Sequence, residues 1–197
     1  TYYIPASVRM NDLVEHRERS DRFQLLNGEW KFQYYNSIYD VTESFYEKGY
    51  DVSGFDQVTV PSVWQMDGYD THQYTNIRYP FPFDPPYVPQ DIPCGAYVHN
   101  FEYHREEKAS KAFLNFEGVD SCFYVWVNGA YAGYSQVPHA TSEFDVTDLL
   151  NEGENTLAVL VLKWCDGSYL EDQDKFRMSG IFCLLYTSDA ADELDGV

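Results

Sequence analysis

The highest density of groups that could do chemistry lies in the stretch DGSYLEDQDKFRMSGIF, over residues 166–182. Glu171, Asp172 and Asp174 fall within it, between aromatic and apolar neighbours. Carboxylates that stand so close together can catalyse glycoside hydrolysis, bind a cation, or accept hydrogen bonds from a hydroxylated ligand. The spacing of the three acids helps to separate these uses.

Catalysis by this cluster alone is disfavoured. A glycosidase needs two carboxyl groups held about 5 to 9.5 Å apart on either side of the scissile bond, normally by separate elements. Glu171 and Asp174 instead share one short loop, and the segment lacks the D-x-[DN]-x-[DN]-G order of a calcium loop. We expect one carboxylate to turn inward towards a cation or a sugar hydroxyl, with a solvated acidic loop as the alternative.

Length and charge exclude several classes of protein. The 197 residues are 44% hydrophobic, which is enough for one sizeable core. The formal net charge of −19 disfavours nucleic acid and anionic membrane surfaces as partners. No apolar run is long enough to span a bilayer, and no basic and apolar leader opens the sequence. Because the chain starts on Thr1, we expect it to be processed or to be a piece of something longer.

The cysteines and histidines indicate neither a disulfide framework nor a metal centre. The four cysteines are widely scattered and form no C-x-x-C pair, which favours a reduced, cytoplasmic setting. The five histidines show no metal spacing. His99 and His104, for example, are five residues apart on a predicted strand and would face opposite sides of it.

Strand patterns dominate the elements that must position these groups. Runs rich in β-branched and aromatic residues are bounded by Gly, Pro, Asn and Asp: EWKFQYY, QVTVP, AYVHNFEYH, KAFLNFEG, CFYVWV, AYAGYS and NTLAVLVLKW. Asn128 and Gly129 separate two of these runs and predict a hairpin, since both tolerate the positive φ of a type I′ turn. Short strands at regular intervals predict an all-β fold, an antiparallel β-sandwich or jelly roll.

Two segments stand apart from this pattern. Six of the nine prolines lie in residues 79–93, which predicts a stiff loop suited to presenting side chains to a ligand. A P-x-x-P motif for a partner module is the alternative. Residues 183–197, read CLLYTSDAADELDGV, turn abruptly to small and acidic residues, from which we expect no packing.

Seven stretches in register resemble one known family. They are LNGEWKF, VPSVWQMDGYD, YTNIRYPFPFDPPYVP, FEGVDSCFYVWVNGAYAGYSQ, SEFDVTDLL, GENTLAVLVLKW and DGSYLEDQDKFRMSGIF. Together they closely resemble the N-terminal sugar-binding domain of family-two glycoside hydrolases, specifically the large bacterial β-galactosidases. The resemblance implies a jelly-roll, galactose-binding-like domain over residues 26–182 that packs beside a catalytic (β/α)₈ barrel. Residues 1–25 then form an N-terminal arm, and residues 183–197 look like translated sequencing adapter, with a divergent native tail as the alternative.

The resemblance also implies roles for four residues. Asn76, in the YTN motif, matches an asparagine that hydrogen-bonds a galactose hydroxyl. Asp174, the last acid of EDQD, matches an aspartate that ligates sodium and reaches the 6-hydroxyl of the sugar. Gln136 and Asp166 match positions that help to hold a structural magnesium ion. The W-x-N-P opening of many relatives is absent here, which puts the magnesium site in doubt.

The resemblance predicts part of an enzyme rather than a whole one. The parent reaction would be retaining hydrolysis of terminal β-D-galactosides such as lactose, by a cytoplasmic enzyme that assembles as a homo-oligomer. The catalytic glutamates would belong to the barrel, so this chain alone should be inactive. Phe81, Phe83 and Tyr87 are the expected apolar face towards the barrel. A stand-alone carbohydrate-binding module is the rival hypothesis, and a purely structural interaction domain is a weaker third.

Overall fold

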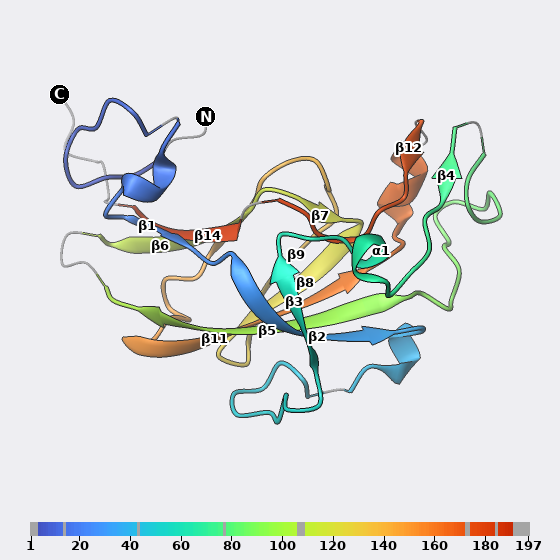
Figure 1. Cartoon of the computed structure of the whole chain (residues 1–197), viewed down its shortest axis with the longest axis horizontal. Helices are drawn as coiled ribbons and strands as arrows, with labels where there is room; N and C mark the ends of the chain where they lie inside the picture. The colour runs from blue at the N-terminus through green and yellow to red at the C-terminus, as the bar shows by residue number, and fades with distance from the viewer. Residues whose placement is uncertain are drawn as a thin grey trace.

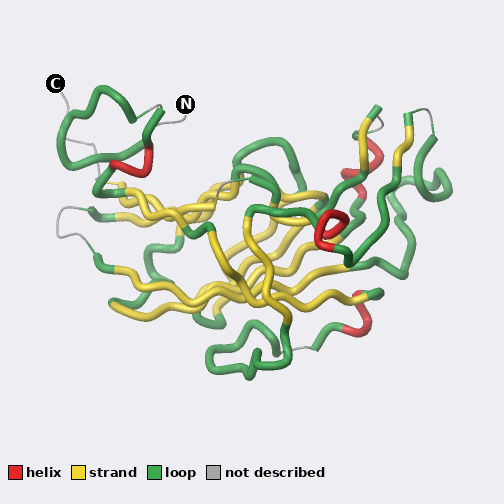
Figure 2. The backbone as a smooth tube through the Cα atoms, in the orientation of Figure 1, coloured by secondary structure: helices red, strands yellow, loops and turns green. Residues whose placement is uncertain are grey.

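Two antiparallel β-sheets face each other in the computed structural model, which describes residues 4–13, 15–42, 44–76, 78–105, 109–171, 174–183 and 185–190 (Figures 1 and 2). The larger sheet has the order β3 (Asp56–Val60), β2 (Gly28–Tyr35), β5 (Cys94–Tyr103), β11 (Gly153–Leu162), β8 (Cys122–Val127) and β9 (Ala130–Ser135). The smaller sheet has the order β1 (Phe23–Leu25), β14 (Leu185–Ala190), β6 (Lys111–Phe116) and β10 (Ser142–Asp145). The prediction of an all-β antiparallel sandwich is confirmed.

The remaining elements are short. Two ribbons stand outside the main sheets: β4 (Tyr74–Thr75) pairs with β12 (Lys175–Phe176), and β7 (Val119–Asp120) pairs with β13 (Gly180–Ile181). The helical pieces are η1 (Arg17–Arg19), η2 (Ile38–Asp40), α1 (Trp64–Asp67) and η3 (Asp166–Leu170). None of the described helices is long and apolar enough to cross a membrane.

The central strands are buried on both faces. Between the sheets, aromatic and branched side chains from β2, β6, β8 and β11 form the main core, where the rings of Phe116 and Phe123 lie 4.8 Å apart. On the other face of the larger sheet, Cys94, Leu160 and neighbours pack under side chains from residues 35–55 and 124–126. This double burial explains why β5 begins with the buried run CGAYV and β11 ends with the buried run LAVLVL, without the alternation of a strand that has one face in solvent.

The hairpin prediction is confirmed. Asn128 and Gly129 have φ values of +53° and +83°, and they join β8 to β9. The positive φ at both positions is the requirement of a type I′ turn, which few residue pairs other than Asn-Gly meet without strain. The Asn128 side chain also donates to the Leu149 carbonyl at 2.8 Å, so the turn is tied to the chain that enters β11.

The proline-rich segment of residues 79–93 contains no described helix or strand, as predicted. It is nevertheless packed, because Phe81 lies in a small cluster with Trp164 and Tyr169. Phe81 is only 9% exposed, whereas Phe83 and Tyr87 are exposed. The expectation that Phe81 belongs to an exposed apolar face is therefore wrong, and Phe83 and Tyr87 alone point outwards.

The start of the tail is structured, contrary to what its composition suggested. Residues 185–190 form β14, which lies between β1 and β6 and pairs with both. Tyr186 is buried and stacks on Phe23, with ring centroids 4.3 Å apart. The packed region of the chain thus begins at β1, before Leu26, and continues beyond Phe182. Residues 191–197, the rest of the tail, lie outside the described residues.

Candidate functional site

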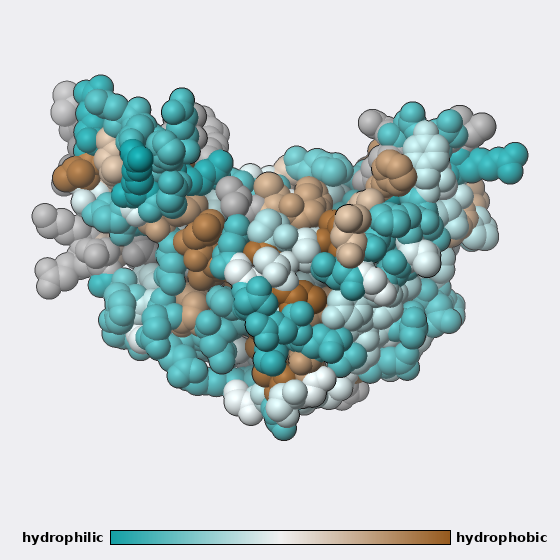
Figure 3. Space-filling view, viewed as in Figure 1, coloured by the Kyte–Doolittle hydropathy of each residue, from teal (hydrophilic) through white to brown (hydrophobic). Residues whose placement is uncertain are grey.

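The β4–β12 ribbon brings together two residues that the sequence analysis singled out. Its register pairs Thr75 with Lys175 and Tyr74 with Phe176. Continuing this antiparallel register by one position sets Asn76 opposite Asp174, although the two are far apart in the sequence. The ribbon stands at one end of the molecule, and the N-terminal segment with η1 stands at the other (Figure 1). Between these projections the surface is hollowed, and apolar side chains gather in and around the hollow (Figure 3).

The outer face of the ribbon is exposed and carries mixed chemistry. The Tyr74 hydroxyl donates a hydrogen bond to Oδ1 of Asp174. The rings of Tyr74 and Phe176 lie 5.4 Å apart, and these residues are 55% and 57% exposed. Strand alternation places Asn76 on the side of Tyr74, and Asn76 is also exposed. An amide, a carboxylate and two aromatic rings are the usual means of contacting a polyhydroxylated ring.

This donor set fits an alkali cation in part. The Asp174 carboxylate and the Asn76 amide oxygen are hard ligands of the kind that sodium takes. Among the described residues, however, no group of three or more His, Cys, Asp or Glu side chains could hold a metal ion. A cation at Asp174 would therefore need further ligands other than a cluster of such side chains, for example carbonyl oxygens.

Gln136 lies next to Gly167, the residue that follows Asp166 in η3. Asp166 is exposed, and its Oδ1 accepts from the N–H of Gly167 at 2.9 Å. A Cβ built on Gly167 would lie 3.4 Å from the carbonyl oxygen of Gln136. The Gln136 side-chain oxygen already accepts from the Tyr134 hydroxyl at 2.7 Å. The two oxygen donors fit a magnesium ion in type, but together they supply only one carboxylate.

Of the other two acids of the opening segment, the structure describes only Glu171. Glu171 caps the C-terminal end of η3 and is half-buried. Asp172 lies outside the described residues. Asp174 is exposed and contacts the ribbon through the hydrogen bond that it accepts from Tyr74, so it is not turned inward. Its use by a cation or a sugar stays a prediction.

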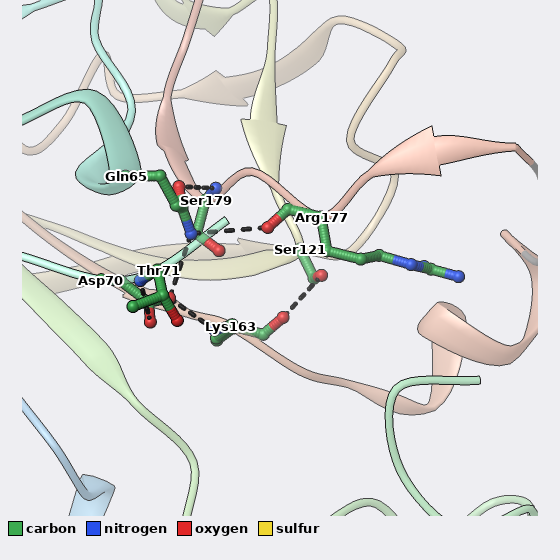
Figure 4. A network of polar contacts seen from close by, with 7 residues as sticks. All are labelled: Gln65, Asp70, Thr71, Ser121, Lys163, Arg177 and Ser179. Carbon is green, nitrogen blue, oxygen red and sulfur yellow. Dashed lines mark hydrogen bonds and ion pairs between the residues drawn. The ribbon is translucent and has the colours of Figure 1, made fainter. Parts of the chain in front are cut away.

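The sequence analysis missed a polar network behind the ribbon (Figure 4). Nζ of Lys163 lies 2.5 Å from Oδ2 of Asp70, and both side chains are almost fully buried. The same oxygen accepts from Nε2 of Gln65 at 3.0 Å, and Oε1 of Gln65 accepts from the N–H of Ser179 at 2.9 Å. The network fixes residues 62–71 to the segment that follows β12. The sequence signal was the single charge of Lys163 at the end of an apolar run.

The contact between Tyr74 and Asp174 can be tested by titration. Donation to the carboxylate stabilises the protonated phenol, so it raises the pKa of Tyr74 above its ordinary value. We expect Asp174→Ala to lower that pKa, so that Tyr74 ionises at lower pH in the variant. The measurement is the ¹³Cζ resonance of labelled tyrosine against pH. Tyr69, whose pKa is raised to about 12 chiefly by burial, serves as the unchanged control. An identical Tyr74 midpoint in both proteins would contradict the contact.

Comparison with known proteins adds a family and several relatives. Residues 23–188 match the family model described as glycosyl hydrolases family 2, sugar binding domain. The chain is 52% identical over 185 residues to a β-galactosidase of Actinobacillus pleuropneumoniae, covering 94% of this chain and 18% of the relative. It is 48% identical over 193 residues to a β-galactosidase of Staphylococcus xylosus, covering 98% and 19%. The chain thus spans less than a fifth of the length of these relatives.

Solved structures agree on the fold. A β-glucuronidase of Bacteroides uniformis superimposes with a TM-score of 0.65 at 18% identity, over 87% of this chain and 18% of that one. A β-glycosidase of Bacteroides vulgatus gives a TM-score of 0.58 at 24% identity, over 84% and 20%. At these identities the likeness concerns the architecture of the domain alone.

Proposed function

The chain belongs to the sugar-binding domains of glycosyl hydrolase family 2, and from this premise we propose that it forms part of a β-galactosidase and contributes to its galactose site. The observation that carries the proposal is the ribbon, which sets Asn76 opposite Asp174 on an exposed face. The relatives named β-galactosidases, at 52% and 48% identity, support it. Their greater length fits a catalytic barrel supplied by the rest of the protein.

The two ribbon residues would bind and orient the sugar. The Asn76 amide offers both a donor and an acceptor to one hydroxyl, so it can fix the direction of that hydroxyl. The Asp174 carboxylate accepts from a hydroxyl, and its hydrogen bond from Tyr74 holds it in one orientation. A sodium ion beside Asp174 would supply a fixed positive charge near that hydroxyl. Gln136 and Asp166 would contribute to a magnesium site that supports the loop from a distance.

The hydrolysis itself would be done elsewhere. Retaining cleavage needs an acid/base carboxyl and a nucleophilic carboxylate about 5 Å apart, and both would belong to the catalytic barrel of the longer protein. Groups that position the substrate lower the barrier only when such a pair is present. The proposal extends to a homo-oligomeric, cytoplasmic enzyme. The location is supported by the four free cysteines, which suit a reducing compartment.

Joining the chain to the missing part of a relative tests the proposal. We expect the 197-residue chain to show no hydrolysis of an aryl β-galactoside above background. Residues 1–190 joined to the remainder of the Actinobacillus pleuropneumoniae enzyme should hydrolyse it. The catalytic glutamate variant of the joined enzyme is the control for contaminating activity.

Three outcomes would contradict the proposal. Turnover by the chain alone that disappears with Asp174→Ala would place the catalytic groups within this chain. A joined enzyme that folds but hydrolyses no β-galactoside would remove the assignment to galactosides. If the chain alone binds galactose tightly and joining adds nothing to binding, the stand-alone carbohydrate-binding module is the better description.

A further inference from the structure

The inner face of the β4–β12 ribbon differs sharply from its outer face. The N–H of Arg177 donates to the carbonyl of Gln73 at 2.8 Å, which extends the ribbon by one pair. Strand alternation then places Gln73, Thr75 and Arg177 on the side opposite Tyr74 and Phe176. Whereas the outer rings are more than half exposed, Arg177 is only 4% exposed. The ribbon therefore has one face towards solvent and one polar face that is covered.

Four polar atoms on this inner face are buried and have no hydrogen-bond partner among the residues that the structure describes: Oε1 of Gln73, Oγ1 of Thr75, and Nε and Nη2 of Arg177. Unpartnered buried polar groups are rare in native proteins. A buried ionised group without a partner costs several kcal/mol. Because three residues on one face of the ribbon have such unpartnered atoms, we expect a hydrogen-bonding partner to bind at this face.

The neighbouring polar network does not supply that partner. Figure 4 shows the Arg177 side chain extending away from the other six residues drawn. Only the backbone carbonyl of Arg177 joins the network, by accepting from Nε2 of Gln65 at 3.4 Å. The carboxylate of the network, Asp70, is already held by Lys163 and Gln65. The positive charge of Arg177 is thus left unmatched by Asp70.

The donor and acceptor types of the four unpartnered atoms indicate which chemical groups they would bind. Nε and one terminal nitrogen of a guanidinium lie on one edge and donate in parallel, which matches the two oxygens of a single carboxylate. The Thr75 hydroxyl can donate to the same group. Oε1 of Gln73 needs a donor instead, such as a backbone N–H. A peptide segment that carries an Asp or Glu supplies both, whereas a small free anion leaves Gln73 unmatched.

We propose that Gln73, Thr75 and Arg177 form a carboxylate-binding site for an Asp or Glu from the part of the full-length enzyme that is absent from this chain. This inference rests on the proposed function, in which more than four-fifths of the protein lies outside the chain. Because Nε and Nη2 are covered here, the ribbon must shift for the carboxylate to reach them. Arg177 is then a positioning residue, since its pairing fixes β12 and with it Asp174.

Hydrogen exchange of the ribbon amides tests this site. We expect peptides that contain residues 73–76 and 174–178 to exchange at least roughly tenfold more slowly in the joined enzyme than in the 197-residue chain. Arg177→Met should abolish that difference in exchange rate. Arg177→Lys keeps the charge but lacks the two parallel N–H donors of the guanidinium, so it should retain only part of the difference. Arg78→Met, at an exposed arginine nearby, is the matched control and should change nothing. Peptides from β5 and β11 should be unaffected throughout.

Thermal unfolding separates this role from a purely structural one. In the 197-residue chain Arg177→Met should leave Tm unchanged or raise it, because it removes an unpaired buried charge. A lower Tm in that chain would show that Arg177 already has its partner there and would overturn the proposal. Slowing of the ribbon amides in that chain by excess succinate alone would assign the site to a free small carboxylate, which also overturns it.

The activity of the joined enzyme separates failure of the carboxylate-site proposal from failure of the galactosidase proposal. An active joined enzyme whose ribbon amides exchange as fast as in the chain alone overturns the carboxylate site and leaves the galactosidase proposal standing. An inactive joined enzyme with an unprotected ribbon overturns both.

Discussion

Asp174→Asn in the joined enzyme is expected to lower kcat/KM for a β-galactoside by roughly 30- to 1,000-fold and to remove most of the response to added sodium. The substitution keeps the shape of the side chain but removes the charge that a cation needs. It also weakens the acceptor of the Tyr74 hydrogen bond, which in the proposed site would face the sugar as well. The measurement is steady-state kinetics over a series of sodium concentrations at constant ionic strength.

Asn76→Ala provides the internal comparison. It removes one neutral hydrogen-bonding partner, so the loss in kcat/KM should be smaller, about 5- to 150-fold, and activation by sodium should persist. Asp91→Asn, at an exposed acid in the proline-rich segment, is the charge-matched control and should have little effect. Asp172→Asn, at the acid just before the ribbon, is also expected to be mild.

The pattern of these variants decides the assignment. An unchanged sodium response in Asp174→Asn, or equal losses for Asp172→Asn and Asp174→Asn, would show that the residue roles are wrong even though the family is right. A sodium response lost in Asn76→Ala as well would instead make both side chains cation ligands.

The second large effect concerns the end of the chain. Truncation after Phe182 should destabilise the domain by at least 3 to 5 kcal/mol, a range typical of losing one large buried aromatic side chain. Tyr186 is 3% exposed and stacks on Phe23, and β14 also supplies the backbone ladder between β1 and β6. Since whole domains are stable by only about 5 to 15 kcal/mol, the truncated chain should be largely unfolded near body temperature.

Urea denaturation of matched lengths measures this effect. Residues 1–190 should unfold at the same urea concentration as the full chain, whereas residues 1–182 should unfold at a much lower one. Tyr186→Ala in the full chain separates the side chain from the strand, because it removes the ring and keeps the ladder. From composition alone, truncation after Phe182 was expected to change the free energy of unfolding by no more than roughly 0.5 kcal/mol. A transition of the 1–182 chain at the same midpoint would support that expectation and would show that β14 contributes nothing.

The features that could be predicted from the sequence are those that depend on the residue types within one short segment. The Asn128–Gly129 turn follows from the φ values that these two residues tolerate. The strands β5 and β11 follow from runs rich in β-branched and aromatic residues that are bounded by turn residues. The proline-rich loop follows from missing N–H groups. Each of these signals lies within one segment, so no knowledge of the neighbours is needed.

For the candidate site, the sequence indicated the residues but not that they lie side by side. Asn76 and Asp174 were named by resemblance of their motifs, and no local rule places one beside the other. Their proximity depends on the pairing of β4 with β12, which joins two segments that are distant in the sequence. The Lys163–Asp70 pair is of the same kind, since a charge at the end of an apolar run says only that some partner is needed.

Only the tertiary structure shows that residues 185–190 form a strand. LYTSDA has little intrinsic strand signal, yet β1 and β6 leave a gap that one extended segment fills, and Phe23 provides a surface for Tyr186. Strand formation reflects packing against neighbours more than backbone preference, so a weak sequence can be a strand where its neighbours demand one. The same reasoning applies to Arg177: the sequence shows that it is charged, but only the fold shows that it is buried and that its Nε and Nη2 have no partner among the described residues.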